Sequence, residues 1–183
     1  MTVPEFHRPH RLDQIGAGES SLTVTADAAE RAALAERFDL QAIDSLQASY
    51  KLRSEAGGVR ATGHLSAKVV QSCVVTGDPV PAAVDEDFDI RFLPEGSSSD
   101  SDEVELSEDE CDTVFFTGGA IDLGEAAAET LALALDPFPR SPAAGETLKT
   151  AGVISEDEAE ALKAKESSPF GALAGLKDQL SKD

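Results

Sequence analysis

Apolar and polar residues alternate along two neighbouring stretches of the chain, residues 45–53 and 59–73. A period of two residues is typical of a β-strand that buries one face. Gly57 and Gly58 lie between the stretches and can supply the positive φ of a tight turn, so the pattern predicts a β-hairpin. The predicted buried face consists of Leu46, Ala48, Tyr50, Leu52, Val59, Ala61, Leu65, Ala67, Val69 and Cys73.

A third alternating run covers residues 84–92, and three aspartates and one arginine fill its polar positions. The segment TGDPVP at 76–81 precedes it, and its glycine, aspartate and prolines predict a turn. Three long antiparallel strands joined by turns form a meander with one solvated face. The segments SLTVT at 21–25 and TVFF at 113–116 are expected to add further strands.

Two helices are predicted from the pattern Asp-x-x-Glu, which begins at Asp27 and again at Asp122 and is typical of a capping box. The second helix should end before Pro137, because the residue before a proline avoids helical geometry. Residues 137–155 hold three prolines and are predicted to form an extended connector. The expected fold class is therefore α+β, with an antiparallel β-meander or partly closed barrel and two packing helices.

Charge is unevenly distributed along the 183 residues, whose formal net charge is −20. The stretch 94–112 holds nine acids and no base. Such a run buries too little apolar surface to offset the entropy of ordering it, which predicts a solvated acidic loop. A docking strip for a basic partner is the alternative interpretation. We expect an N-terminal arm over 1–19, a single α+β domain over 20–144 that contains this loop, and a flexible tail over 145–183.

The expected tail contains two helical patterns. Ser155 followed by Glu158 predicts the start of a short charged helix. Further on, apolar residues recur every three or four positions, which suits an amphipathic segment that docks on the domain or on a partner. These residues are Phe170, Leu173, Leu176 and Leu180.

Several function classes are excluded by what the sequence lacks. It has no apolar run long enough to span a membrane and no apolar core of a signal peptide near its start, which predicts a cytoplasmic protein with reduced thiols at Cys73 and Cys111. Its glycines form no nucleotide-binding motif, and it has no nucleophile elbow. His7 and His10 lie in the arm that we expect to be loose, which makes a metal site there unfavourable. We therefore expect no catalytic residue, cofactor, metal, small-molecule substrate or membrane partner, and a hydrolase that uses paired carboxylates is a minor alternative.

One cationic feature stands out in this acidic chain. Strand parity directs five side chains of the predicted hairpin to its solvated face, opposite the apolar one. One interpretation is an ordinary polar surface, and the other is a patch that contacts RNA phosphates. The five residues are Lys51, Arg53, Arg60, His64 and Lys68.

Three segments together resemble the YceD family of bacterial and plastid proteins, which are described as large ribosomal RNA subunit accumulation proteins. They are CVVTGDPV at 73–80, IDLGEAAAETLALALDPFPR at 121–140 and PFGALAGLK at 169–177, and RFDLQAIDSL at 37–46 fits as the lead-in to the hairpin. The resemblance covers about residues 20–177. It implies a non-enzymatic role in the synthesis, processing or accumulation of 23S ribosomal RNA and in large-subunit assembly.

The resemblance also assigns positions. Cys73 corresponds to the first strand-end cysteine of the family, and many members have further cysteines where this chain has Thr76 and Arg140-Ser141, so a zinc site suspected in those members cannot be built here. Cys73 is more simply explained as a small apolar residue at a strand end, and Asp122 is equally well explained as a helix N-cap. The other matched positions are Glu129, Pro137 and Pro139.

Two partner classes remain open at this point. The cationic face or the strand-end turn at 73–80 would contact a ribosomal RNA precursor. However, a chain of net charge −20 attracts a polyanion poorly over long range. The alternative is an acidic adaptor or holding protein that binds a basic ribosomal or assembly protein through residues 94–112 and the tail.

Overall fold

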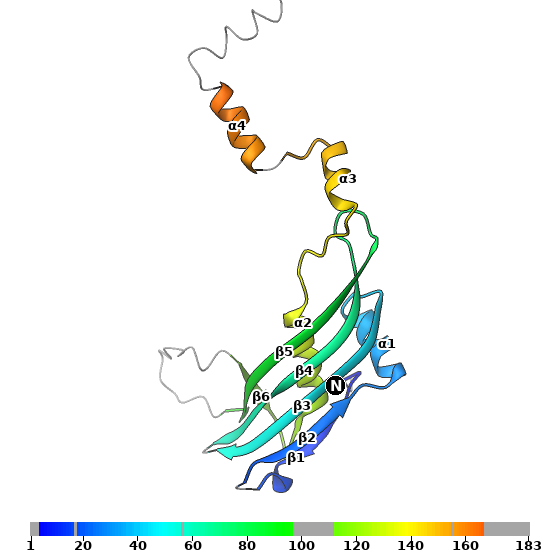
Figure 1. The fold of residues 1–183 in the computed structure, drawn as a ribbon. Coiled ribbons are helices and arrows are strands. Elements are labelled where there is room, and N and C mark those ends of the chain that lie inside the picture. Colours follow the sequence, from blue (N-terminus) through cyan, green and yellow to red (C-terminus); the bar gives the residue numbers. More distant parts are fainter. Residues whose placement is uncertain (1–3, 17, 56, 97–111, 155, 167–183) are drawn as a thin grey trace, which may run out of the picture.

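The computed structural model describes residues 4–16, 18–55, 57–96, 112–154 and 156–166. Its centre is a five-stranded sheet in the order β2-β3-β4-β5-β6 (Figure 1). A second sheet pairs β1 with β7. The strands are β1 (Pro9–Arg11), β2 (Ser20–Thr25), β3 (Ala42–Glu55), β4 (Gly58–Ser72), β5 (Pro79–Pro94), β6 (Thr113–Phe116) and β7 (Ala120–Asp122). The helices are α1 (Ala28–Arg37), α2 (Leu123–Ala134), α3 (Ala144–Thr150) and α4 (Glu156–Glu166), with a 3-10 turn at Leu12–Gln14.

The α+β fold class is confirmed, and the large sheet is mostly antiparallel. Strands β2 to β5 pair as antiparallel neighbours, whereas β6 runs parallel to β5. The sheet is open, with β2 and β6 at its ends, so the alternative of a partly closed barrel was wrong. The hairpin turn is confirmed by Gly57, whose φ is +92°.

The turn predicted over residues 76–81 was too long, because its last three residues belong to strand β5. Strand β5 begins at Pro79, and both Pro79 and Pro81 pair with β4 in its regular register. A proline inside a strand is tolerated where its missing N–H would point away from the neighbouring strand, as at a sheet edge. The prediction of an extended connector over 137–155 was also wrong in part, because α3 occupies residues 144–150.

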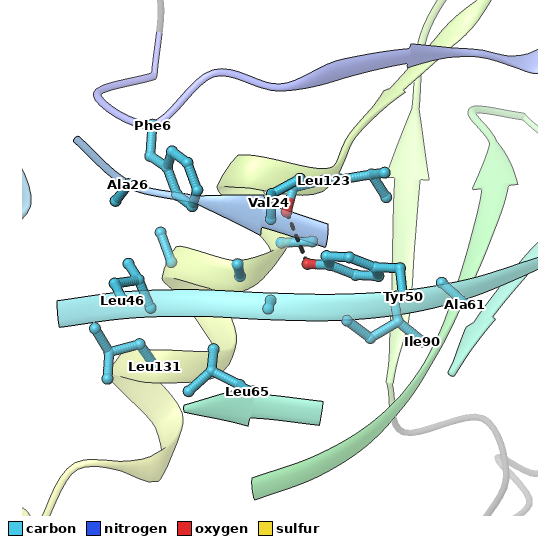
Figure 2. Close-up of a cluster of buried hydrophobic side chains, with 14 of the residues drawn as sticks. Phe6, Val24, Ala26, Leu46, Tyr50, Ala61, Leu65, Ile90, Leu123 and Leu131 are labelled. Atoms are coloured by element: carbon cyan, nitrogen blue, oxygen red, sulfur yellow. Dashed lines mark hydrogen bonds between the residues drawn. The ribbon is translucent and has the colours of Figure 1, made fainter. Parts of the chain in front are cut away.

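Helix α2 closes the core over one face of the sheet. Its N-terminal half is buried, and Leu131 is completely buried against the sheet residues Leu46 and Leu65 (Figure 2). The hydroxyl of Tyr50, which is 1% exposed, donates a hydrogen bond of 2.7 Å to the backbone oxygen of Leu123. This bond satisfies the only polar atom of the Tyr50 side chain and ties β3 to the start of α2.

The N-terminal segment is part of the same core. Phe6 is completely buried and Ile15 is 7% exposed, and β1 pairs with β7 more than a hundred residues later in the chain. Arg8 forms two hydrogen bonds, of 2.6 and 2.8 Å, to the carboxylate of Glu30 in α1. The expectation that this segment is loosely held was therefore wrong.

Two predicted features lie outside the described residues. Most of the acidic loop predicted over 94–112 falls there, and so does the amphipathic pattern from Phe170 to Leu180. The charged helix predicted near Ser155 is present as α4, which begins at Glu156. Within the described part of the chain, no helix combines the length and apolar character needed to cross a membrane.

Candidate functional site

The five cationic residues predicted for the hairpin lie on the face of the sheet opposite the core. Their side chains follow the period-two pattern that buries their neighbours Tyr50, Leu52 and Leu65. All are exposed except His64, which is half-buried. We call this surface the cationic face, and its members are Lys51 and Arg53 on β3 and Arg60, His64 and Lys68 on β4.

The cationic face is elongated rather than compact. Arg53 lies directly across from Arg60, while Lys68 pairs with Ser45 near the opposite end of the hairpin. Arg60 and Lys68 are eight positions apart, which corresponds to roughly 26 Å in an extended strand. The charges therefore form a group of three around Arg60 and a separate lysine, with His64 between them.

Strand β5 adds three carboxylates to the same face. The sequence analysis did not predict that they lie beside the cations. The register places Asp85, Asp87 and Asp89 opposite Ser66, His64 and Thr62 of β4. These aspartates were visible as the polar positions of the third alternating run. Their place beside His64 depends on the register between β4 and β5, which the alternation alone does not give.

Two of the cations pair with these aspartates. Arg60 Nε donates to Asp89 at 2.9 Å, and this hydrogen bond is the main cause that lowers the pKa of Asp89. The His64 Nδ1 lies 2.8 Å from Asp87 and its Nε2 lies 3.2 Å from Asp85. In the described part of the chain, no ion pair engages the remaining cations of the face, Lys51, Arg53 and Lys68.

The pKa of His64 should show whether its ring pairs with Asp87 and Asp85. The hydrogen bond to Asp87, followed by the charge of Asp85, raises the His64 pKa above its ordinary 6.5. A raised pKa in the folded state means that the pair stabilises the protein fully below pH 6.5 and that this contribution is lost as the pH rises through the folded value. We expect the His64 ring resonances in an NMR titration to give a pKa above 6.5, and the substitution Asp87→Asn to lower it.

Glu86→Gln is the matched control, because Glu86 is the neighbouring acid on β5 but belongs to the opposite parity. It removes the same charge from the same strand without removing a hydrogen-bond partner of His64. A His64 pKa at or below 6.5 in the unmodified protein would contradict the pairing.

A second polar cluster lies where β4 ends and the chain turns toward β5. The segment after α2 runs beside this turn: Val74 N–H donates to the oxygen of Pro139 at 2.9 Å, and the side-chain amide of Gln71 donates to Asp136 at 2.8 Å. The Thr76 hydroxyl donates to the Asp78 carboxylate at 2.7 Å. The Ser141 hydroxyl donates to the same carboxylate at 3.2 Å. We call Cys73, Thr76, Asp78 and Ser141 the strand-end cluster.

The surroundings of Cys73 combine burial with hydrogen-bond donors. Its side chain is 3% exposed, and burial by itself raises the pKa of the thiol. Hydrogen bonds to the sulfur, of which that from the backbone N–H of Ser141 has the largest effect, act in the opposite direction and lower the pKa to about 6. One thiol with two hydroxyls and a carboxylate does not fit a structural zinc site, which takes three or four Cys or His ligands.

The remaining matched positions have identifiable structural roles. Asp122 is the N-cap of α2, since its carboxylate accepts hydrogen bonds from the N–H groups of Gly124 and Glu125 at 3.1 and 3.2 Å. Pro137 is exposed just after α2, and Pro139 is buried beside the strand-end turn. Glu129 projects from α2 as an exposed side chain, yet partial desolvation, followed by the charge of Glu125, raises its pKa.

The N-terminal histidines take part in the fold. His7 pairs through Nδ1 with Asp122, while His10 lies on β1 and pairs in register with Ile121. Among the residues that the structure describes, no group of three or more His, Cys, Asp or Glu is arranged to hold a metal ion.

The comparisons with known proteins identify the family of the chain. The family model described as "Large ribosomal RNA subunit accumulation protein YceD" matches residues 61–177, which is well over half of the sequence. No curated protein and no solved structure gives a significant match. The match includes most of β4 and all of β5, the strand-end cluster and α2. The chain therefore belongs to the YceD family of large ribosomal RNA subunit accumulation proteins.

Proposed function

We propose that this protein is a non-enzymatic, cytoplasmic factor that supports the synthesis, processing or accumulation of 23S ribosomal RNA and thereby the assembly of the large ribosomal subunit. The observation that carries the proposal is the family match over residues 61–177. The surface chemistry is compatible with a binding role, because the cationic face holds lysines that no ion pair of the described chain engages. The sheet and the buried core supply a rigid support for such a surface.

The proposal is tested by depleting the protein in its own cells and measuring 23S against 16S ribosomal RNA. We expect 23S RNA and 50S particles to fall relative to 16S RNA and 30S particles, because only the large subunit depends on the factor. Re-expression of the unmodified chain serves as the control and should restore the ratio. Equal levels of both RNAs after depletion would remove the assembly role.

We further propose that Lys51, Arg53 and Lys68 are the part of the cationic face that contacts a phosphate backbone, since Arg60 and His64 already face aspartates. The three aspartates of β5 limit the net attraction of this face for RNA, so any contact should be short-ranged and weakened by salt. A variant carrying Lys51→Glu, Arg53→Glu and Lys68→Glu should fail to restore the 23S level if the face contacts RNA. Full restoration would exclude this face as the contact surface.

A further inference from the structure

Among the residues that the structure describes, most of strand β5 has no neighbour on one of its two edges. On one side it pairs with β4 over residues 79–92, whereas on the other side it pairs with β6 only over residues 91–94. Within the described chain, residues 79–90 of β5 therefore form an open edge of the sheet. An open edge presents unpaired backbone N–H and C=O groups to any strand that can reach it.

The hydrogen bonds near β6 show which groups point to this edge. The N–H of Arg91 donates to Asp112 at 2.9 Å and that of Glu95 donates to Phe116 at 2.9 Å, so odd-numbered residues of β5 direct their backbone groups away from β4. The register between β4 and β5 is continuous, so the same holds along the whole strand. The outward N–H groups are those of Ala83, Asp85, Asp87 and Asp89.

Pro79 and Pro81 are odd-numbered as well. Proline has no N–H to donate, and in a sheet it is confined to edge positions of this kind. The two prolines protect the first part of the edge from non-specific pairing, while residues 83–89 keep their outward donors. The usable edge is thus about seven residues long, close to the length of an ordinary strand.

A hollow of about 1300 Å³ reaches this edge at residues 86–90 of β5. It is bordered by Asp87 and Asp89, on the outer face, and by Phe88 and the α2 residues Glu129 and Leu133, on the inner side. It also continues over the outer face as far as β2. A strand added in the plane of a sheet sends alternate side chains to both faces, so space on both sides of the edge is what such a strand requires.

The carboxylates beside this edge determine which charge an added strand should carry. Asp85 and Asp87 have side chains that are 74% and 91% exposed, and Glu86 and Glu129 lie on the inner side of the edge. Partial desolvation, followed by the charge of Glu125, raises the pKa of Glu129, and the charge of Arg37 offsets this only in part. Carboxylates on both faces repel a second copy of this strand and attract a strand that carries lysines or arginines.

The inner side also offers an apolar contact. Leu133 on α2 is 86% exposed, and Phe88 on β5 is half-buried and packs its ring 4.9 Å from that of Tyr50. Both border the same hollow. A valine, leucine or isoleucine on the inner face of an added strand would cover Leu133 and lie against the Phe88 ring.

We propose that the open edge of β5 at residues 83–89 binds an extended lysine- or arginine-rich segment of a partner protein by strand addition. The outward N–H and C=O groups provide affinity, and the carboxylates of β5 and α2 select the cationic sequence. This inference gives a partner class to the proposed ribosome-assembly factor, and in that sense it rests on the proposed function. Its test uses purified components, so its failure is distinguishable from failure of the 23S measurement in cells.

The probe is a fluorescein-labelled dodecapeptide in which Lys-Thr-Lys-Val is repeated three times. We expect it to bind the full chain in a fluorescence-anisotropy titration, and the affinity to fall as salt is added. The same peptide with every second backbone nitrogen methylated keeps its charge but cannot complete strand pairing on one edge. It should bind at least roughly tenfold more weakly.

Two sets of variants locate the contact. The double variant Glu86→Lys with Glu129→Lys should weaken binding of the peptide roughly tenfold. The control, Glu36→Lys with Glu146→Lys, makes the same change in net charge on α1 and α3. It should change the affinity by less than about twofold. Asp87→Pro removes an outward N–H that Asp87→Ala retains, so the proline variant should bind more weakly than the alanine variant. Circular dichroism confirms that each variant is folded.

Three outcomes would overturn the proposal. One is equal loss of binding in the two double charge variants, which would indicate attraction by net charge alone. Another is equal affinity for the methylated and unmethylated peptides. The third is binding of a twelve-nucleotide polyuridine RNA that is strengthened by Glu86→Lys with Glu129→Lys while the peptide does not bind, which would assign the edge to RNA.

Discussion

The substitution Phe6→Ala is expected to lower the free energy of unfolding by about 3–5 kcal/mol, the range found when a fully buried phenylalanine is truncated. Phe6 has no exposed surface and lies beside Ala26 and the start of α2 (Figure 2). Its ring also lies 4.8 Å from the guanidinium of Arg8, which is bound to Glu30 of α1. Loss of the ring leaves a cavity and weakens the attachment of β1. The measurement is urea unfolding followed by circular dichroism, with the midpoint shifted and the slope unchanged.

Leu133→Ala is the matched control, because it truncates a large apolar side chain that is 86% exposed. It should change the free energy of unfolding by less than about 0.5 kcal/mol. A loss below about 1 kcal/mol for Phe6→Ala would mean that the N-terminal segment contributes little to the fold, in agreement with the sequence reading rather than with the structure.

The prediction of a loosely held N-terminal arm was wrong for a physical reason. Period-two alternation is a local signal, and it was sufficient for β3, β4 and most of β5 because each is long and buries one face. Strand β1 has only three residues, and its partner β7 also has three. Such short strands carry no readable period, and their pairing is determined by burial of Phe6 and by the bonds of Arg8 and Asp122.

The candidate site, too, could be predicted from the sequence only in part. Side-chain parity correctly predicted that Lys51, Arg53 and Arg60 share a solvated face. Parity does not say which residue of the next strand lies beside each cation, and this depends on the length of the turn at 73–78 that joins β4 to β5. The aspartates that face Arg60 and His64 and the open edge of β5 both follow from that register.

Pro79 and Pro81 show that proline is compatible both with a turn and with the open edge of a strand. In the sequence they predicted a turn, which is correct for the segment immediately before them, where Gly77 has a φ of +74°. In the structure they belong to a strand whose outer edge pairs with no other described residue at these positions. The distinction depends on whether a neighbouring strand requires the missing N–H, and only the three-dimensional arrangement supplies that information.

The substitution Gly63→Ala is expected to destabilise the protein by about 3 kcal/mol, at the upper end of the usual cost of overpacking a core. A Cβ atom on Gly63 would lie 2.0 Å from the backbone oxygen of Ser49 and 2.5 Å from the ring of Phe88. Ser49 belongs to the paired part of β3, and Phe88 packs against Tyr50, so neither can move without disturbing the sheet or the core. The urea midpoint should fall, as measured by circular dichroism.

Gly145→Ala makes the same chemical change at a position in α3 where an added Cβ meets no atom within 4 Å. Because alanine is the better helix former, this control should leave the free energy of unfolding unchanged or raise it by up to about 1 kcal/mol. Equal effects of the two substitutions would mean that β3 and β4 do not approach each other at Gly63 as closely as the structure shows. Because β5 pairs with the other edge of β4, that result would also place the register of β5, and with it the open edge, in doubt.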